Sequence, residues 1–339
     1  MLNGKSFDRG LVIEVTDVKC EFGLRVLCAS VVLFGLLVET DAGERSKVSI
    51  RSSADGTKQP SYVILPEGFD PSGEAVPLLV SLHSWSANLE QRNEPLENLA
   101  EQRGWIYLFP NFRGRNDNPA ACGSELAQQD ILDAVEWAKR RYPIDARRIY
   151  LTGSSGGGHM TMLMVGRHPN VWAAASAWVG ISDLAAWHKK HVGSNYGNMM
   201  EAACGGAPGS SEAVDEQYRK RSPLIYLHRA ADVPLDIAAG VHDGYTGSVP
   251  TRHSLEAFNE VAKAAKATRI TEDEIKQISR RDGRLEKPLP SDQVDDASLD
   301  REIHLRRTAG KCRVTIFEGG HEGIATAAIE WLARHKKED

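Results

Sequence analysis

A serine flanked by glycines stands where an apolar run gives way to a helical pattern. The segment Gly153-Ser154-Ser155-Gly156-Gly157 fits the pattern G-x-S-x-G, with Ser155 at its centre. Glycines at these positions permit a sharp turn that lifts the serine hydroxyl above a sheet edge, at the N-terminus of the next helix. The segment predicts that Ser155 is a nucleophile. A Gly/Ser linker matching by chance is disfavoured by the strand–helix context, and a phosphate-binding loop is excluded because no lysine follows the glycines.

A serine nucleophile needs a base, and the base needs an acid that orients it. His321 follows the last apolar run on a glycine-rich loop and is the predicted base, and a purely structural histidine is the alternative. Asp243 ends the preceding apolar run and is the predicted acid. Asp183, after an earlier run, is the rival acid, and Asp236 is a weaker one because it lies within a run.

The oxyanion that forms during attack on a carbonyl needs two backbone donors. The N–H of Gly156, directly after the nucleophile, is one predicted donor. The other is the N–H of Trp85 in the loop His83-Ser84-Trp85, which follows a strongly apolar run. Trp85 is expected either to wall the acyl pocket or to pack in the core. His83 lies in the same loop and is a candidate substrate-binding residue.

Other polar and aromatic residues are weaker candidates. Arg113 and Arg115 follow a predicted strand, and they either bind an acidic substrate or are solvated loop charges. Trp187 is a candidate substrate-binding residue in an aromatic segment. His188 and His191 have helical metal-ligand spacing, but no third ligand is evident, so a solvated helix face is the favoured interpretation. The sequence assigns no metal ligands.

The order of apolar runs and helical patterns predicts a mostly parallel sheet covered by helices on both faces. Predicted strands cover residues 47–51, 61–65, 78–83, 105–110, 148–152, 173–179, 235–241 and 313–317. Predicted helices cover 124–141, 157–167 and 323–334, with a further helix that carries Leu96 and Leu99.

Two segments interrupt this pattern within a single predicted domain, residues 43–339. Residues 181–222 are expected to form a loop-rich, cap-like excursion that contains several aromatic side chains. Residues 269–301 contain 16 charged residues out of 33 and no aromatic residue. That composition cannot fill a core, so this segment is expected to be a solvated surface insertion.

The first 42 residues are interpreted as a leader. Residues 26–38 are apolar, Lys19 and Arg25 precede them, and small residues at 40–42 offer a cleavage site before Gly43. Thirteen apolar residues are short for a membrane span, although an uncleaved anchor is the alternative. We therefore expect a secreted or periplasmic protein that has no membrane contact beyond the leader.

Net charge and cysteine content limit the classes of partner and the disulfides that the chain can be expected to have. The chain carries 41 Lys and Arg against 46 Asp and Glu, a formal net charge of −5, which gives no reason to expect nucleic acid as a partner. Outside the leader, the cysteines are Cys122, Cys204 and Cys312. In an exported protein a Cys122–Cys204 disulfide and three unrelated buried thiols are equally expected.

From about residue 47 onward, the chain resembles the α/β-hydrolase superfamily. It is most similar to prolyl oligopeptidase catalytic domains and to feruloyl and acetyl esterases. The resemblance rests on Leu65-Pro66-Glu67-Gly68-Phe69-Asp70, Leu82-His83, the G-x-S-x-G segment, Gly240, Asp243, Val249-Pro250, His253-Ser254 and Gly320-His321. Ser155, Asp243 and His321 also follow one another in the order typical of this superfamily. The chain departs from the usual pattern where Ser84 replaces a glycine and where 244–248 is longer than usual.

The resemblance implies a Ser–His–Asp enzyme that cleaves an ester or an amide without a cofactor. Family oligopeptidases carry a large propeller, for which this chain leaves no room, so an ester is favoured over a peptide. The expected partner is a small-molecule or polysaccharide-linked ester, with acyl groups on carbohydrate or phenolic material as one possibility. A non-catalytic binding protein on the same fold is the alternative of another class, and the oligomeric state stays open.

Overall fold

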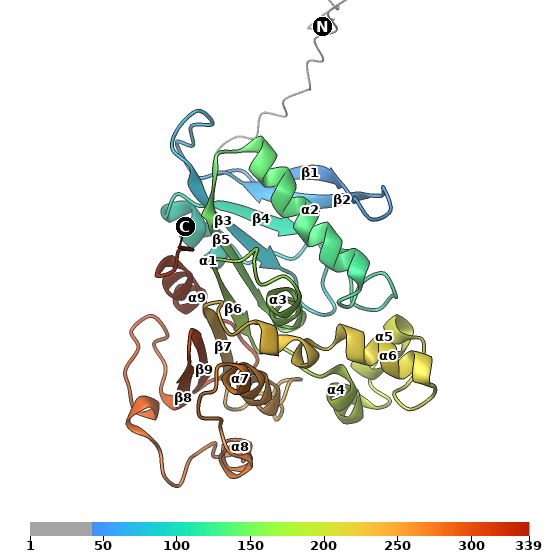
Figure 1. Ribbon diagram of the computed structural model, residues 1–339, viewed down its shortest axis with the longest axis vertical. Helices are drawn as coiled ribbons and strands as arrows, with labels where there is room; N and C mark the ends of the chain where they lie inside the picture. Colours follow the sequence, from blue (N-terminus) through green and yellow to red (C-terminus); the bar gives the residue numbers. More distant parts are fainter. Residues whose placement is uncertain (1–42, 339) are drawn as a thin grey trace, which may run out of the picture. The chain divides into compact units, whose positions relative to one another are not determined.

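Residues 43–338 of the computed structural model are described, and they form one mixed sheet with helices packed on it (Figure 1). The predicted leader lies outside these residues. Within them, nine strands follow the order β1-β2-β4-β3-β5-β6-β7-β9-β8. The strands are β1 (Ser46–Arg51), β2 (Lys58–Ile64), β3 (Val76–Leu82), β4 (Ile106–Pro110), β5 (Ile144–Ser154), β6 (Ala174–Trp178), β7 (Leu235–Gly240), β8 (Ile303–Ala309) and β9 (Cys312–Phe317).

The centre of the sheet is parallel and its two margins are antiparallel. Strands β4, β3, β5, β6, β7 and β9 run in one direction, whereas β1, β2 and β8 pair antiparallel with their neighbours. The mostly parallel sheet was predicted from the apolar runs, but β8 was not. The carboxyl ends of β3, β5, β7 and β9 lie at the same edge, which is where ligands bind in open α/β sheets.

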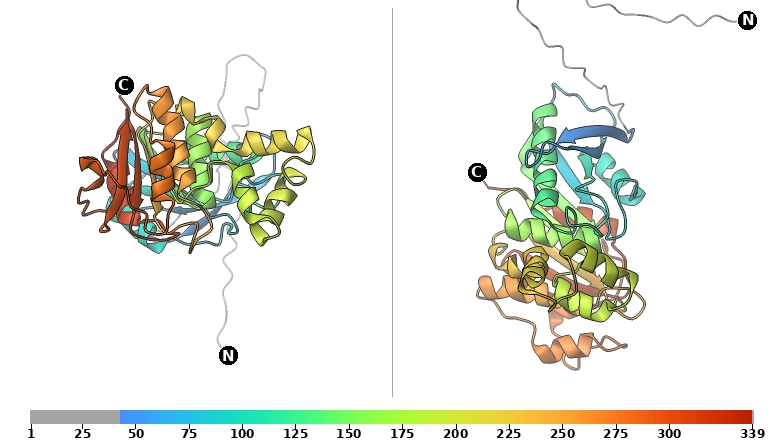
Figure 2. Two further views of the ribbon diagram at one scale, coloured as in Figure 1. Left: turned by 90° about the horizontal axis from the view of Figure 1, so that it is seen from below. Right: turned by 90° about the vertical axis from the view of Figure 1, so that its right-hand side faces the viewer.

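Helices cover both faces, as predicted. On one face, α1 (Glu94–Gln102) and α9 (Ala325–Ala333) pack on an apolar cluster that includes Tyr107 and Tyr150. On the other face, α2 (Glu125–Arg141), α3 (Gly156–Arg167) and α7 (Arg252–Ala264) contribute to the larger core cluster. The side views in Figure 2 show helices on both sides of the sheet.

Helix α2 illustrates how local sequence sets an element. The Ser124 hydroxyl accepts a hydrogen bond from the Ala127 N–H and begins the helix, as N-terminal serines commonly do. Ile131, Ala134 and Val135 are buried on one face. The helix therefore lies against the sheet with its charged side outward.

The segment predicted to be loop-rich, 181–222, is largely helical. It contains α4 (Leu184–His191), α5 (Asn195–Cys204) and α6 (Glu212–Arg221), and two short 3-10 turns, η1 (Pro223–Ile225) and η2 (Leu227–Arg229), follow. Each of the three helices begins at a side-chain cap, namely Asp183, Ser194 or Ser211. The caps end the preceding loops sharply, so little irregular chain is left.

The charged segment, 269–301, is more firmly attached than predicted. It contains α8 (Glu272–Ile278) and the 3-10 turn η3 (Pro290–Asp292). Ile270, Ile275, Ile278 and Leu299 are buried in the main core cluster. The prediction that this composition cannot fill a core overlooked four aliphatic anchors between the charged residues.

Cys122, Cys204 and Cys312 are buried free thiols. Cys122 and Cys204 belong to one apolar cluster and their thiols contact each other, whereas Cys312 lies in the main core. Burial raises the pKa of the Cys122 thiol. The structure therefore shows the free-thiol alternative, although Cys122 and Cys204 are neighbours rather than unrelated. In the part of the chain that the structure describes, no helix is both long and apolar enough to cross a membrane.

Candidate active site

Ser155 occupies a strained turn between β5, which ends at Ser154, and α3, which begins at Gly156. Its backbone has φ 59° and ψ −117°, a conformation that L-residues rarely adopt. The Ser155 N–H donates to the Trp178 carbonyl of β6 at 2.9 Å, which ties the turn to the neighbouring strand. The geometry is that of a serine presented at the sheet edge on the first turn of a helix, as the motif predicts.

His321 and Asp243 are brought together from the ends of β9 and β7. The His321 Nδ1 lies 2.7 Å from the Asp243 Oδ2. The Asp243 side chain is fully buried, and its Oδ1 accepts hydrogen bonds from the N–H groups of Gly244 and Val249 at 2.9 and 3.0 Å. An Nδ1–H donated to the carboxylate leaves the Nε2 of His321 unprotonated, which is the state that a general base requires.

The loop that carries His321 reaches the serine turn two residues later. A Cβ on Gly247 would lie 2.3 Å from the Asp243 Oδ1 and 2.5 Å from the His321 Cβ, and a Cβ on Gly323 would lie 2.3 Å from the Ser154 Oγ. The backbone that carries His321 therefore lies against both the acid loop and the serine turn. Among residues 43–338 the Ser155 Oγ forms no hydrogen bond. Such contacts often tighten only when substrate binds.

The two rival acids are engaged elsewhere. Asp183 caps α4 by accepting from the Ala185 and Ala186 N–H groups at 2.9 and 3.1 Å. Asp236, which is buried within β7, accepts from Arg313 at 2.8 Å and from Ser176 at 3.1 Å. Neither carboxylate is hydrogen-bonded to His321.

The two predicted oxyanion donors, Gly156 and Trp85, lie close to each other beside the serine. A Cβ on Gly156 would lie 2.3 Å from the Trp85 nitrogen and 2.4 Å from the Trp85 Cα, so only a glycine permits this approach. Neither the Gly156 N–H nor the Trp85 N–H donates to a backbone carbonyl among the described residues. Two unused N–H groups at the start of a helix are suited to a developing negative charge.

An aromatic cluster extends from these donors toward the acid loop. The Trp85 ring contacts Trp187 with 4.7 Å between centroids, and Trp187 contacts His191 and Tyr196 at 5.0 and 5.2 Å. Trp85 and Trp187 are almost fully buried, whereas His191 and Tyr196 are partly exposed. For Trp85 the observed burial matches the core-packing alternative. Trp187, predicted to bind substrate, contributes through packing instead.

Side chains of helix α4 donate hydrogen bonds to backbone carbonyl groups of the long loop 244–248. The Lys190 Nζ donates to the Gly244 carbonyl at 2.6 Å. The Trp187 Nε1 donates to the Ser248 carbonyl at 2.9 Å, and the His191 Nε2 contacts the same oxygen at 2.8 Å. Sequence reasoning missed the role of Lys190. The unusual length of 244–248 was the one signal that the loop needed support.

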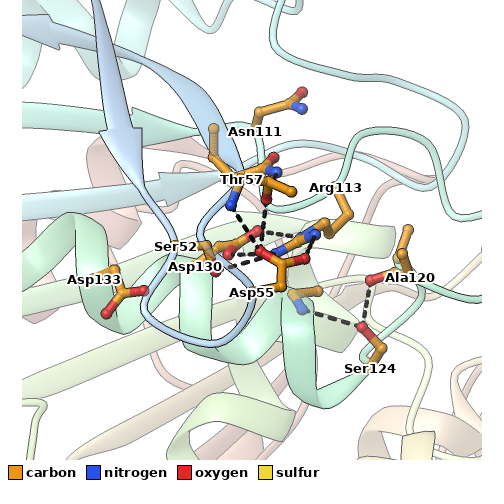
Figure 3. Close-up of polar contacts among 12 residues, drawn as sticks. Ser52, Asp55, Thr57, Asn111, Arg113, Ala120, Ser124, Asp130 and Asp133 are labelled. Carbon is orange, nitrogen blue, oxygen red and sulfur yellow. Dashed lines mark hydrogen bonds and ion pairs between the residues drawn. The ribbon is translucent and has the colours of Figure 1, made fainter.

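The prediction that Arg113 binds an acidic substrate is wrong, because its charge is already paired within the protein. Figure 3 shows the guanidinium directed at Asp55 and Asp130 rather than at a free surface, and only 8% of the side chain is exposed. These two carboxylates neutralise it, so it has no charge to offer a substrate. Arg115, with 48% of its side chain exposed beside Asp117, matches the solvated loop charge.

His83 is likewise occupied. It is fully buried and stacked on Phe112 with 3.9 Å between centroids. Its ring nitrogens lie 2.9 Å from the Ser84 carbonyl and 3.0 Å from the Asn111 carbonyl, and burial lowers its pKa. His83 shapes the loop that carries Trp85 and does not contact a substrate directly.

The His188 and His191 pair does not converge on one point. His188 is buried with its Nε2 2.8 Å from Glu201, while His191 contacts the Ser248 carbonyl. The predicted solvated face is therefore wrong for His188.

A separate small cavity touches the serine turn at Ser154 and is lined by Phe109, Trp178 and Ile324. Because Ser155 does not line it, this cavity is not the reacting site.

Comparison with known proteins places this chain among hydrolases. The model of the prolyl oligopeptidase family matches residues 96–274, more than half of the chain. Feruloyl esterase B of Talaromyces stipitatus is 29% identical over 161 residues, which cover 44% of this chain and 38% of that protein. Acetylxylan esterase A of Emericella nidulans is 24% identical over 200 residues, 56% of this chain and 57% of that protein. The matched region thus spans less than two thirds of the length of each of these relatives.

Solved structures confirm the predicted α/β-hydrolase fold. Acylaminoacyl peptidase of Pyrococcus horikoshii superposes with a TM-score of 0.56 at 21% identity, covering 68% of this chain and 37% of that one. Prolyl oligopeptidase B of Galerina marginata gives a TM-score of 0.54 at 18% identity, covering 69% and 34%. At these identities the likeness concerns the fold alone.

Proposed function

This chain belongs to the prolyl oligopeptidase family and is by class a serine hydrolase, and from this premise we propose that it cleaves carboxylic esters through Ser155, His321 and Asp243. The observation that carries the proposal is the 2.7 Å contact between His321 and the buried Asp243, at the sheet edge where Ser155 stands on its strained turn.

In the proposed reaction the Ser155 Oγ attacks the ester carbonyl and transfers its proton to the His321 Nε2. Asp243 stabilises the resulting imidazolium, and the Gly156 and Trp85 N–H groups bind the oxyanion. Collapse of the tetrahedral intermediate breaks the ester bond, and His321 gives the proton to the departing alcohol. Water, deprotonated by His321, then releases the carboxylic acid and restores the Ser155 hydroxyl.

The choice of an ester rests on two lines of support. The two curated relatives described above are named as esterases of feruloyl and acetylxylan groups. The partly exposed rings of His191 and Tyr196, backed by Trp187, offer an aromatic wall near the oxyanion donors. Such a wall favours a planar aromatic acyl group such as a hydroxycinnamoyl group, because aromatic rings stack well on one another. A peptidase is the second candidate, favoured by the family name itself.

The predicted leader also bears on where in or outside the cell the protein acts. An acetylated xylan is a polymer, and an enzyme that acts on such a substrate meets it outside the cytoplasm. We therefore propose an exported protein whose N-terminus after maturation is close to Gly43. Sequencing the N-terminus of protein recovered from a secreting host tests this, and a chain that keeps residues 1–42 inside the cell contradicts it.

A panel of substrates tests the activity. Methyl ferulate, acetylated xylo-oligosaccharides, p-nitrophenyl acetate and aminoacyl anilides are compared with wild type and with Ser155→Ala. We expect ester turnover that falls by about 10⁴-fold or more in the variant. Faster turnover of the anilides than of every ester would establish the peptidase, and equal rates for both proteins would remove Ser155 from the reaction.

A second pair of variants tests the acid. Asp243→Asn is expected to lower kcat by roughly 10⁴-fold, because the amide favours the wrong imidazole tautomer. Asp183→Asn is the matched control and should lower kcat only slightly. The reverse ranking would make Asp183 the functional acid.

A further inference from the structure

A histidine in the edge strand β8 faces two carboxylates at the margin of the sheet. His304 lies in β8, and only 3% of its side chain is exposed. Its Nε2 lies 2.8 Å from the Glu318 Oε2, while Glu302 is close by, directly before β8. The Nε2 of His304 and one carboxylate oxygen each of Glu302 and Glu318 all lie within 4.8 Å of one another.

The hydrogen bonding of His304 is incomplete when its imidazole is neutral. Its Nδ1 lies 3.1 Å from the Gly283 carbonyl, so both ring nitrogens face oxygen acceptors. A neutral imidazole has a single N–H and can satisfy only one of them. When Nδ1–H donates to Gly283, the Nε2 lone pair points at the carboxylates, which is the arrangement of a metal-binding histidine with its other nitrogen on a backbone carbonyl.

The backbone around the cluster is shaped for this contact. The pairing of β8 with β9 shifts register between Ile303 and Leu305, so His304 sits at a bulge, a device that re-aims a side chain. Gly283 has φ +55°, and a Cβ there would lie 2.0 Å from the Val241 Cγ2. Only a glycine can therefore bring this carbonyl to the histidine.

The carboxylates are also oriented. The His242 Nε2 lies 2.7 Å from the Glu318 Oε1, which leaves Oε2 directed at His304. Glu302 is 57% exposed, and its one ion pair is with Arg284 at 3.5 Å, so this carboxylate is free to turn. Carboxylates held by outer hydrogen bonds are typical of metal ligands.

We propose that His304, Glu302 and Glu318 bind a divalent transition-metal cation, with Zn²⁺ as the probe. One imidazole and two carboxylates suit Zn²⁺, and solvent can supply the remaining position because Glu302 and Glu318 are exposed. Ligand atoms on a tetrahedral zinc ion lie about 3.3 Å apart. The 2.8 Å separation between His304 and Glu318 therefore needs to open by only about half an ångström.

No sequence pattern reveals this site, because its residues match no zinc spacing. Glu302 directly precedes β8 and His304 lies within it. Glu318 directly follows the paired strand β9, and its N–H donates to the Glu302 carbonyl at 2.8 Å. A bound ion would tie β8 to the segment that leads into His321. The proposal does not depend on ester hydrolysis.

Titration calorimetry of the full-length chain with ZnCl₂, after EDTA treatment and desalting, tests the site. Wild type should show one saturable site and a raised Tm with zinc. Glu302→Gln should weaken the affinity at least tenfold. Glu286→Gln is the matched control, because Glu286 is exposed and pairs with Arg280 at 3.4 Å, and it should leave the affinity unchanged.

Two results would overturn the proposal. Absence of saturable zinc binding by wild type would mean that His304 is held as an imidazolium, with a proton in place of the metal. Unchanged affinity in Glu302→Gln would place the zinc at other side chains. His304→Gln serves as a second variant, and Glu302→Gln decides the matter if His304→Gln fails to fold.

Discussion

The segments 181–222 and 269–301 leave the same sheet but attach to it by opposite means. The first buries Trp187, Met200 and Tyr218 in an apolar cluster of its own, next to Trp85. The second adds four aliphatic side chains to the main core and relies on ion pairs, such as Asp296 with Arg306 at 2.8 Å. In Figure 1, α4, α5 and α6 lie together, well separated from α8.

The difference indicates a division of labour. The first segment holds the loop 244–248 through Trp187, Lys190 and His191, and so supports the acid Asp243. The second touches this loop at one residue, Tyr245, whose hydroxyl donates to the Ser279 carbonyl and whose ring lies under Arg281. Changes in the first segment should therefore alter catalysis, whereas changes in the second segment away from Tyr245, such as those in its buried ion pairs, should alter stability alone.

The largest expected effect is that of Trp187→Ala. The substitution empties a fully buried site and should lower the free energy of unfolding by roughly 3–5 kcal/mol. Loss of the donor to Ser248 should also lower kcat/KM for p-nitrophenyl acetate at least tenfold. Trp137→Ala, at a partly buried tryptophan on α2, is the control. Equal kcat/KM in both variants would break the link between α4 and the acid loop.

In the second segment, Asp292→Asn should lower the free energy of unfolding without changing catalysis. The buried carboxylate pairs with Arg307 and accepts from the Arg306 and Leu289 N–H groups, each at 2.7 Å. Removing one partner of a buried pair costs about 3 kcal/mol, measurable by urea unfolding. The kcat of the folded variant should match that of wild type, and a large loss of kcat would contradict the division of labour.

Acid should weaken the attachment of the two segments in different pH windows, through His253 of α7 for the first and Asp296 for the second. Burial lowers the pKa of His253, which accepts from the Ser182 N–H, to about 3. This stability is present above the unfolded pKa of about 6.5 and is lost as pH falls toward 3. Although burial opposes it, hydrogen bonding by Ser298 and Arg306 lowers the pKa of Asp296 to about 2. Its contribution persists until pH falls below about 4.

Urea unfolding across pH checks the first window. Between pH 6.5 and 5, His253 alone should account for about 2 kcal/mol of lost stability. His253→Asn keeps an acceptor for Ser182 and should flatten that slope, whereas His228→Asn, at an exposed histidine, should leave it intact. An unchanged slope in His253→Asn would show that the buried histidine does not titrate on unfolding.

The smallest expected effect belongs to Lys190→Met. An exposed side chain contributes little to stability, but loss of the bond to the Gly244 carbonyl should loosen the acid loop and lower kcat a few-fold. Lys189→Met, one residue earlier and also exposed, is the matched control. Identical kcat values would show that Trp187 and His191 hold the loop without Lys190.

The strands that could be predicted are those whose sequences are continuous runs of apolar residues. The runs 78–83 and 235–241 correspond to β3 and β7 with errors of one or two residues. Strand β8 was missed because its sequence, IHLRRTA, is half polar, as edge strands often are. The helices of 181–222 were missed because their caps, such as Ser211, were not used to begin them.

At the site, backbone features were predictable and long-range partners were not. The turn at Ser155 and the donors at Gly156 and Trp85 follow from a local motif. The partners of Arg113 do not, because Asp55 lies 58 residues away in sequence and no local pattern announces the pair. The approach of Gly247 to His321 is equally invisible without coordinates.

One measurement tests the central claim most directly: intact mass after reaction with a fluorophosphonate probe, which esterifies activated serines. Wild type should gain one label, Ser155→Ala should gain none, and Asp243→Asn should label far more slowly. Peptide mapping should place the label on Ser155. Equal labelling of wild type and Ser155→Ala, or no labelling of folded wild type, would contradict the account.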